Sequence, residues 1–511
     1  MRRMIAFAWK SLLVVGFIVV AAVLGWAFQS RTMAPLERWH TTTLHREFTA
    51  ADAAADTTLE DYLSREETLF EEMKSEVDSH VESNELTLFS RYRSGGTQDP
   101  EAQRPDWNRT FEIAPEHVRG GVLLLHGLTD SPYSLRRIGD LFAANGFYVL
   151  GLRLPGHGTI PGALTRVSWT DWVAASRIGA RHVRGRIGTA LPFVMAGYSN
   201  GGGLSVKYAL DALNDSELPL PDALVLFSPE IGIAQAAAIS NIGEVLTRLP
   251  YFQQFRWLSI EPEYDPYKYN SFPKNAAEQA WNVTKAVQNG LTEARAAGRL
   301  RRFPQLLTFL SWTDSTVDTS ATVQHLFDQL ENPHSELVIF DVNRFDAFAG
   351  FMPTTVDRPL DHLEASADLN YRLTVISNVT PNSRLVAAHS RAAHSTTTES
   401  TPLNLEWPAN VYSLSHVAIP FAPDDPTYGD GGVASETYRG LRLGALQPRG
   451  ETSVLAVSMS QAMRLRHNPF FSYEEERIRG LIDDVVEMKN VPGSARLSSS
   501  VGANGDATVV H

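Results

Sequence analysis

The feature that most restricts the fold of this chain is a series of short apolar runs that alternate with amphipathic helical patterns. Strands covered by helices on both faces are apolar throughout, whereas half-exposed strands alternate apolar and polar residues. The runs predicted as strands are 121–125, 147–152, 193–198, 223–227, 306–310 and 337–340. The pattern predicts an α/β fold with a mostly parallel central sheet and helices on both faces.

Composition supports a globular chain and narrows its chemistry. The 511 residues are 43% apolar and 20% charged, enough for one large domain with insertions. The net charge of −13 argues against binding to nucleic acid, because a phosphate backbone requires a basic surface. The absence of cysteine excludes disulfides, cysteine metal sites and a thiol nucleophile.

A serine stands in a glycine-rich turn between a predicted strand and a predicted helix. Gly197-Tyr198-Ser199-Asn200-Gly201 follows the apolar run 193–198 and precedes a helical pattern at 200–213. In this G-x-S-x-G context the two glycines let strand and helix approach closely, and the serine is held in a sharp turn. We therefore predict Ser199 as a nucleophile, beside a helix N-terminus that favours negative charge.

A second glycine turn lies after the strand at 121–125. Gly127 lets this loop turn so that a backbone N–H points toward the predicted nucleophile. The amides of Leu128 and Asn200 are therefore the predicted oxyanion hole. Two histidines in tight turns, His126 and His157, are interpreted as structural rather than catalytic.

Three motifs in this order carry a resemblance to a known family. Residues 124–127 (Leu-Leu-His-Gly), 155–158 (Pro-Gly-His-Gly) and 197–201 resemble the α/β-hydrolase superfamily, nearest to its monoacylglycerol lipase, carboxylesterase and serine aminopeptidase group. The likeness covers roughly 109–345 and 411–488. It implies the α/β-hydrolase fold, a Ser–Asp–His triad in that chain order, a backbone oxyanion hole and no cofactor. It does not imply a particular substrate.

The resemblance places the triad acid after the run at 306–310. Asp314 occupies that position and would hold the imidazole in the productive tautomer. Asp318, in the same loop, is the rival, and either aspartate could instead cap the helix expected near Thr319.

The base is expected in a loop beyond the next strand. His416 fits because it ends the short apolar segment 411–415, although it lies 102 residues after Asp314, farther than the family pattern implies. Residues 343–410 are therefore predicted to be an insertion, with strands at 372–379 and 384–388. The competing histidines within it are His362, His389 and His394.

Another long segment, 231–303, separates two predicted strands and is interpreted as a helical cap over the site. It is rich in aromatic side chains, which favour an apolar acyl or aryl group unless they only pack the cap onto the core. These residues are Tyr251, Phe252, Phe255, Trp257, Tyr264, Tyr267, Tyr269, Phe272 and Trp281.

The N-terminus predicts a membrane anchor. Arg2, Arg3 and Lys10 precede the apolar run 12–28, which is long enough for a transmembrane helix. The basic flank predicts a cytoplasmic N-terminus and an extracytoplasmic catalytic domain, periplasmic in a bacterium. Cleavage as a signal peptide near 25–27 is the alternative.

The predicted organisation assigns the remaining segments. Residues 1–30 form the anchor, 31–108 a polar, partly helical stem with a solvated acidic face, 109–490 the hydrolase domain and 491–511 a disordered tail. Asp424, Asp425 and Asp430 lack the spacing of a calcium loop and are interpreted as turn residues, so no metal is expected.

Together these features predict a serine hydrolase that cleaves carboxylic esters through an acyl-enzyme on Ser199, with a small-molecule substrate that carries an apolar acyl group. Two other classes stay open. A serine aminopeptidase would need an anionic cluster for a free amine, and Glu261 and Glu263 in the cap are too few to argue one. A membrane-anchored protein that kept the fold without catalysis is the other.

Overall fold

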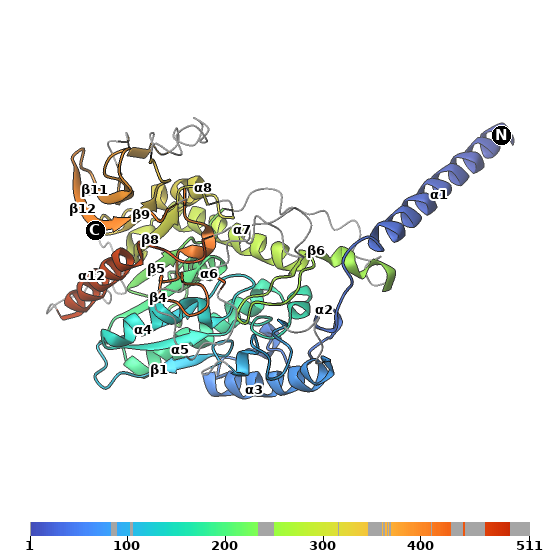
Figure 1. Cartoon of the computed structure of the whole chain (residues 1–511), viewed down its shortest axis with the longest axis horizontal. Helices are drawn as coiled ribbons and strands as arrows, with labels where there is room; N and C mark the ends of the chain where they lie inside the picture. The colour runs from blue at the N-terminus through green and yellow to red at the C-terminus, as the bar shows by residue number, and fades with distance from the viewer. Residues whose placement is uncertain are drawn as a thin grey trace, which may run out of the picture.

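The fold was analysed in a computed structural model of the whole chain. It describes residues 2–82, 89–102, 106–232, 250–314, 316–345, 360, 363–364, 366, 369–409, 411–430, 443–444 and 465–490. Its centre is a ten-stranded sheet in the order β1-β3-β2-β4-β5-β8-β9-β10-β11-β12 (Figure 1). The strands are β1 (Phe111–Ile113), β2 (Gly120–Leu125), β3 (Phe147–Leu152), β4 (Phe193–Tyr198), β5 (Ala223–Phe227), β8 (Gln305–Ser311), β9 (Glu336–Phe340), β10 (Arg372–Asn378), β11 (Leu385–Arg391) and β12 (Thr398–Glu406).

The middle of the sheet is parallel, from β3 through β2, β4, β5, β8 and β9 to β10, and its edges are antiparallel. The residues of β2 alternate between two cores, because successive side chains of a strand point to opposite faces. Leu123 and Leu125 belong to one core, and Val122 and Leu124 to the other. Both faces are covered, which explains the uniformly apolar runs and confirms the predicted fold class.

Helices cover the two faces of the sheet. One core contains α5 (Trp169–Ile187), α6 (Asn200–Ala212) and α7 (Lys274–Ala296). The other contains α4 (Arg136–Ala144) and α12 (Phe471–Asn490) (Figure 1). The parallel strands therefore present their carboxyl ends at one common edge, where ligands bind in open α/β sheets.

The insertion after β9 extends the sheet. β10 pairs in parallel with β9, β11 pairs antiparallel with β10, and β12 is the exposed edge strand. The sequence predicts β10 and β11, but not β12. This strand, TESTPLNLE, lacks an apolar pattern because almost all of it faces solvent, and Pro402 and polar residues are tolerated at an edge.

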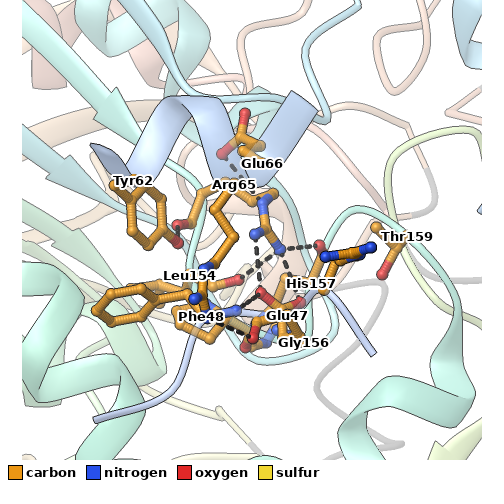
Figure 2. Close-up of polar contacts among 12 residues, drawn as sticks. Glu47, Phe48, Tyr62, Arg65, Glu66, Leu154, Gly156, His157 and Thr159 are labelled. Atoms are coloured by element: carbon orange, nitrogen blue, oxygen red, sulfur yellow. Dashed lines mark hydrogen bonds and ion pairs between the residues drawn. The ribbon is translucent and has the colours of Figure 1, made fainter. Parts of the chain in front are cut away.

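Residues 38–82 pack against the body. This region contains α2 (Arg38–Thr41) and α3 (Leu59–Glu76), whose Leu59 and Tyr62 belong to the main core. The prediction that the acidic residues of this segment face solvent is wrong at Glu66. This residue is buried and accepts hydrogen bonds from Arg153 and Thr110. Figure 2 shows this network beneath α3.

The first helix, α1 (Arg2–Ser30), projects from the body and contacts the 3₁₀ helix Pro250–Arg256 of the cap (Figure 1). Within the part of the chain that the structure describes, no helix combines the length and apolar character needed to traverse a bilayer. The predicted transmembrane anchor is therefore not confirmed. The predicted disordered tail at 491–511 lies outside the described residues.

Candidate active site

Ser199 lies in a strained turn between β4 and α6. Its backbone angles, φ 54° and ψ −117°, lie outside the regions that residues other than glycine ordinarily adopt. Its N–H donates to the carbonyl of Phe227 at 2.9 Å. A Cβ on Gly201 would lie 1.9 Å from the carbonyl oxygen of Leu125, and one on Gly197 would lie 2.3 Å from the oxygen of Gly201. The flanking glycines are therefore required by close backbone approach.

Asp314 and His416, far apart in the sequence, meet above the sheet. The Nδ1 of His416 lies 2.7 Å from Oδ2 of Asp314, and the aspartate side chain is fully buried. The other oxygen, Oδ1, accepts the N–H groups of Thr316 and Val317. Burial favours the neutral carboxyl, but the positive charge of His416 and these hydrogen bonds outweigh it and lower the pKa of Asp314. A carboxylate is therefore favoured beside the imidazole.

The rival aspartate has a different role. Asp318 is the N-cap of α8 (Thr319–His325), and its carboxylate accepts the N–H of Ala321 at 3.2 Å. Among the competing histidines, His389 lies within β11 and His394 follows that strand, while His362 lies outside the described residues. Asp314 is thus the aspartate of this loop that pairs with His416.

His416 begins the 3₁₀ helix His416–Ala418, close to the end of β4. Its ring centroid lies 5.3 Å from that of Tyr198, the residue before Ser199. Both Ser199 and His416 are 7% exposed. The nucleophile turn and the Asp314–His416 pair therefore occupy neighbouring positions at the carboxyl edge of the sheet.

The two predicted oxyanion donors lie in the loop after β2 and at the start of α6. Asn200 is the first residue of α6, where backbone N–H groups lack an acceptor within the helix. Leu128 follows β2, and no hydrogen bond from its N–H is found to a described residue. This loop is held by His126, whose Nε2 accepts the N–H of Leu154 at 3.0 Å.

Neither His126 nor His157 reaches the triad candidates through a hydrogen bond in the described part of the chain. His126 is buried against His157, and burial lowers the pKa of both imidazoles. His157 also contacts Trp172 and the carbonyl of Pro155. These contacts are structural, as expected from the sequence.

Comparison with known proteins points to a superfamily. A family model described as serine aminopeptidase, S33, matches residues 116–344, the region that carries β2 through β9 and the Ser199 turn. This match and a lipase relative both point to the α/β-hydrolase superfamily. Within this superfamily the match falls in the lipase, esterase and S33 group.

Individual relatives of this α/β-hydrolase are more distant. A thermostable monoacylglycerol lipase from Bacillus sp. (strain H-257) is 37% identical over 89 residues, which are 17% of this chain and 34% of that relative. The chain therefore matches about a third of that relative's length.

Solved structures similar to this α/β-hydrolase include two lipases. The monoacylglycerol lipase of Paleococcus ferrophilus is 17% identical, with a TM-score of 0.34 over 45% of this chain and 88% of that one. A soluble variant of monoglyceride lipase from Saccharomyces cerevisiae is 15% identical, with a TM-score of 0.31 over 45% of this chain and 82% of that one.

A buried acid that the sequence analysis did not identify lies beside the site of this hydrolase. Glu230 is the third residue after β5, and its backbone N–H donates to the carbonyl of Ser199 at 3.0 Å. A signal was available, because Ser228-Pro229-Glu230 follows a buried strand at the same edge as Ser199. A carboxyl at that position is a candidate site residue.

The described part of the cap is joined to the hydrolase core by polar and aromatic contacts. Tyr267 stacks on Tyr133 at 3.8 Å between ring centroids, and Lys268 Nζ lies 3.2 Å from Asp130. Four of the nine aromatic residues predicted to shape the site are buried in the protein. The buried members are Phe252, Trp257, Tyr267 and Tyr269.

The acidic residues of the cap and of the 424–430 turn have protein partners. Glu263 is buried and accepts the N–H groups of Asn270 and Ser271. Asp425 accepts the hydroxyl of Tyr133 and the N–H groups of Thr427 and Tyr428. Among the described residues, no group of three acidic or histidine side chains has the arrangement of a metal site.

Proposed function

We propose that this α/β-hydrolase cleaves carboxylic esters through an acyl-enzyme on Ser199. His416 removes the hydroxyl proton as Ser199 Oγ attacks the ester carbonyl, and Asp314 stabilises the resulting imidazolium. The alcohol leaves with the proton returned by His416. A water molecule, activated by the same imidazole, then releases the carboxylic acid and restores the serine.

The observation that carries this proposal is the 2.7 Å contact between Asp314 and His416, beside a serine held in a strained turn. The contact fixes the imidazole with Nδ1 toward the carboxylate and leaves Nε2 as the atom that can accept a proton. The lowered pKa of Asp314 keeps that carboxylate charged when the imidazolium forms.

The amides of Leu128 and Asn200 are the proposed oxyanion hole. Support comes from the place of Leu128 in the loop after β2, from the absence of a described acceptor for its N–H, and from the position of Asn200 at the start of α6. Loss of one such donor typically costs about 3 kcal/mol of transition-state stabilisation.

The proposed substrate is a small ester with an apolar acyl group. Support comes from the named activity of the Bacillus relative and from the family match. A peptidase is less favoured because Glu263, one of the two cap acids considered for binding a free amine, already binds backbone N–H groups of its own loop.

A panel of nitrophenyl esters and aminoacyl anilides tests the proposal. We expect turnover of nitrophenyl esters by the wild-type protein and none by Ser199→Ala. Turnover of anilides without esters would show a peptidase. No turnover of either, together with no labelling by a fluorophosphonate, would show a protein that retains the fold without this chemistry.

We also propose that residues 1–30 attach the protein to a membrane, with the hydrolase domain on the extracytoplasmic side. Support comes from the basic N-terminal flank and from the projecting helix α1, where Phe7, Trp9, Phe17 and Phe28 are between 63% and 75% exposed. Flotation with lipid vesicles should recover the full chain and lose a variant that lacks residues 1–30. Equal flotation of both would contradict the anchor.

A further inference from the structure

Glu230 is an unusual acid for its surroundings. Its side chain is 7% exposed, and Oε2 has no hydrogen-bond partner among the described residues. A buried carboxyl without hydrogen-bond partners lowers the stability of the fold, so its presence is not explained by a contribution to stability. An explanation for this acid must therefore come from something other than a structural hydrogen bond.

The turn that carries Glu230 is rigidly joined to the nucleophile. The N–H of Glu230 donates to the Ser199 carbonyl at 3.0 Å. The hydroxyl of Thr284, on α7, donates to the carbonyl of Glu230 at 3.4 Å. A Cβ added to Gly203 would lie 2.9 Å from that same carbonyl oxygen. The turn at 228–230 is therefore pressed against the first turn of α6 and holds Glu230 at a fixed place beside Ser199.

The electrostatic partner of Glu230 is His416. Burial raises the pKa of Glu230 to about 7, and the positive charge of a protonated His416 opposes that rise. Two other acids face the imidazole. These are Asp314, which is hydrogen-bonded to it, and Asp130, whose charge is paired with Lys268. Among the described residues, the Glu230 carboxyl has no hydrogen bond, and its one cationic partner is His416. The other two acids each have a further partner.

We propose that Glu230 is a positioning residue for His416, whose ionised carboxylate stabilises the imidazolium formed when the Ser199 proton is removed. This inference rests on the proposed function. Asp314 holds the ring through Nδ1, whereas Glu230 acts through space and only when it is charged. Its contribution therefore depends on pH in a way that a purely structural role does not.

The pH dependence of kcat on a nitrophenyl ester tests this. At pH 5.5 Glu230 is neutral, and we expect Glu230→Gln to match the wild-type kcat. At pH 8.5 the carboxylate is charged, and we expect the variant to be about ten-fold slower, the effect of one pKa unit of coupling. Glu230→Asp should recover part of the alkaline rate. A ratio that stays constant with pH would overturn the proposal.

Glu263→Gln is a matched control. Burial also raises the pKa of Glu263 to about 7, but its carboxylate is bonded to the loop around Asn270 and His416 is not among the charges that act on it. Its ratio of kcat to wild type should not change with pH. A change equal to that of Glu230→Gln would show a general effect of lost buried carboxyls and would overturn the proposal.

A second measurement separates this inference from the ester hydrolysis itself. In Ser199→Ala, the ring resonances of His416 can be followed against pH by NMR, with and without Glu230→Gln. We expect the midpoint to move to lower pH when the carboxylate is removed, since an anion favours the charged ring. An unchanged midpoint overturns the role of Glu230 even if esters are hydrolysed. Failure of wild-type turnover would contradict only the proposed function.

Discussion

The carboxylate of Glu47 binds the guanidinium of Arg153, 106 residues farther along the chain, through two hydrogen bonds of 2.9 and 3.1 Å. Arg153 also donates to Glu66 at 3.1 Å and is 1% exposed. It follows β3 and starts the turn whose Leu154 N–H binds His126, in the loop that carries Leu128. The N-terminal segment therefore supports the loop of the proposed oxyanion hole through a buried ion network.

Arg153→Met should strongly destabilise the protein, because it leaves the partly buried Glu47 and the buried Glu66 without this cation. Breaking a buried pair in this way typically costs about 3–5 kcal/mol. Urea denaturation measures the free energy of unfolding. The control is Arg301→Met, which removes an exposed pair with Glu331 and should cost less than about 1 kcal/mol. Equal losses in both variants would contradict the network.

This network could not be predicted from the sequence. The pattern of α3 correctly places Leu59 and Tyr62 on a buried stripe, but the same pattern assigns Glu66 to solvent. Helical periodicity shows which side of a helix is apolar and does not show an arginine brought to that side by a distant turn. Glu47 lies in an irregular segment with no pattern at all.

Ser199→Gly should stabilise the fold while it removes the nucleophile. A serine at φ 54° costs about 1–3 kcal/mol, and glycine relieves most of this strain. The entropy cost of glycine offsets about 1 kcal/mol, so we expect a net gain near 1 kcal/mol in urea denaturation. Ser205→Gly, within α6, should instead lose stability because its hydroxyl bond to Gly201 disappears. A loss in both variants would contradict strain at Ser199.

Asp314→Asn and Asp318→Ala should affect different properties. The first removes the carboxylate from His416 and should lower kcat by about 10³–10⁴-fold with little change in fold. The second removes a helix N-cap and should lower the free energy of unfolding by about 1 kcal/mol, with kcat nearly unchanged. Ester kinetics and denaturation on both variants test the assignment, which would be contradicted if Asp318→Ala were the inactive one.

The stability of Glu230→Gln relative to wild type should depend on pH. The folded pKa of Glu230 is about 7, above its ordinary value of 4.5, so the folded state holds this proton more tightly than the unfolded chain. Wild-type stability from this group is therefore lost as pH rises from 4.5 to 7. We expect the free energy of unfolding of Glu230→Gln, relative to that of wild type, to be on the order of 1–3 kcal/mol higher at pH 8 than at pH 4. A pH-independent difference would contradict the raised pKa.

The parallel strands from β2 to β9 could be predicted because a strand that is buried on both faces needs a short, continuous apolar run, and few other elements do. The Ser199 turn could be predicted because the close approaches at Gly197 and Gly201 permit only glycine. The pairing of Asp314 with His416 required the family resemblance, since an insertion that adds three strands separates them. Glu230 was missed because a single acid in a loop has no period or spacing, and its place directly after a buried strand was the one signal available.

In the proposed mechanism His416 and Asp314 make the hydroxyl of Ser199 reactive, and the rate of covalent labelling by a fluorophosphonate measures this most directly. Wild-type protein should be labelled on Ser199, as read by mass spectrometry, with no labelling of Ser199→Ala and strongly slowed labelling of His416→Ala. Labelling of Ser199 at the same rate in wild type and His416→Ala would contradict it.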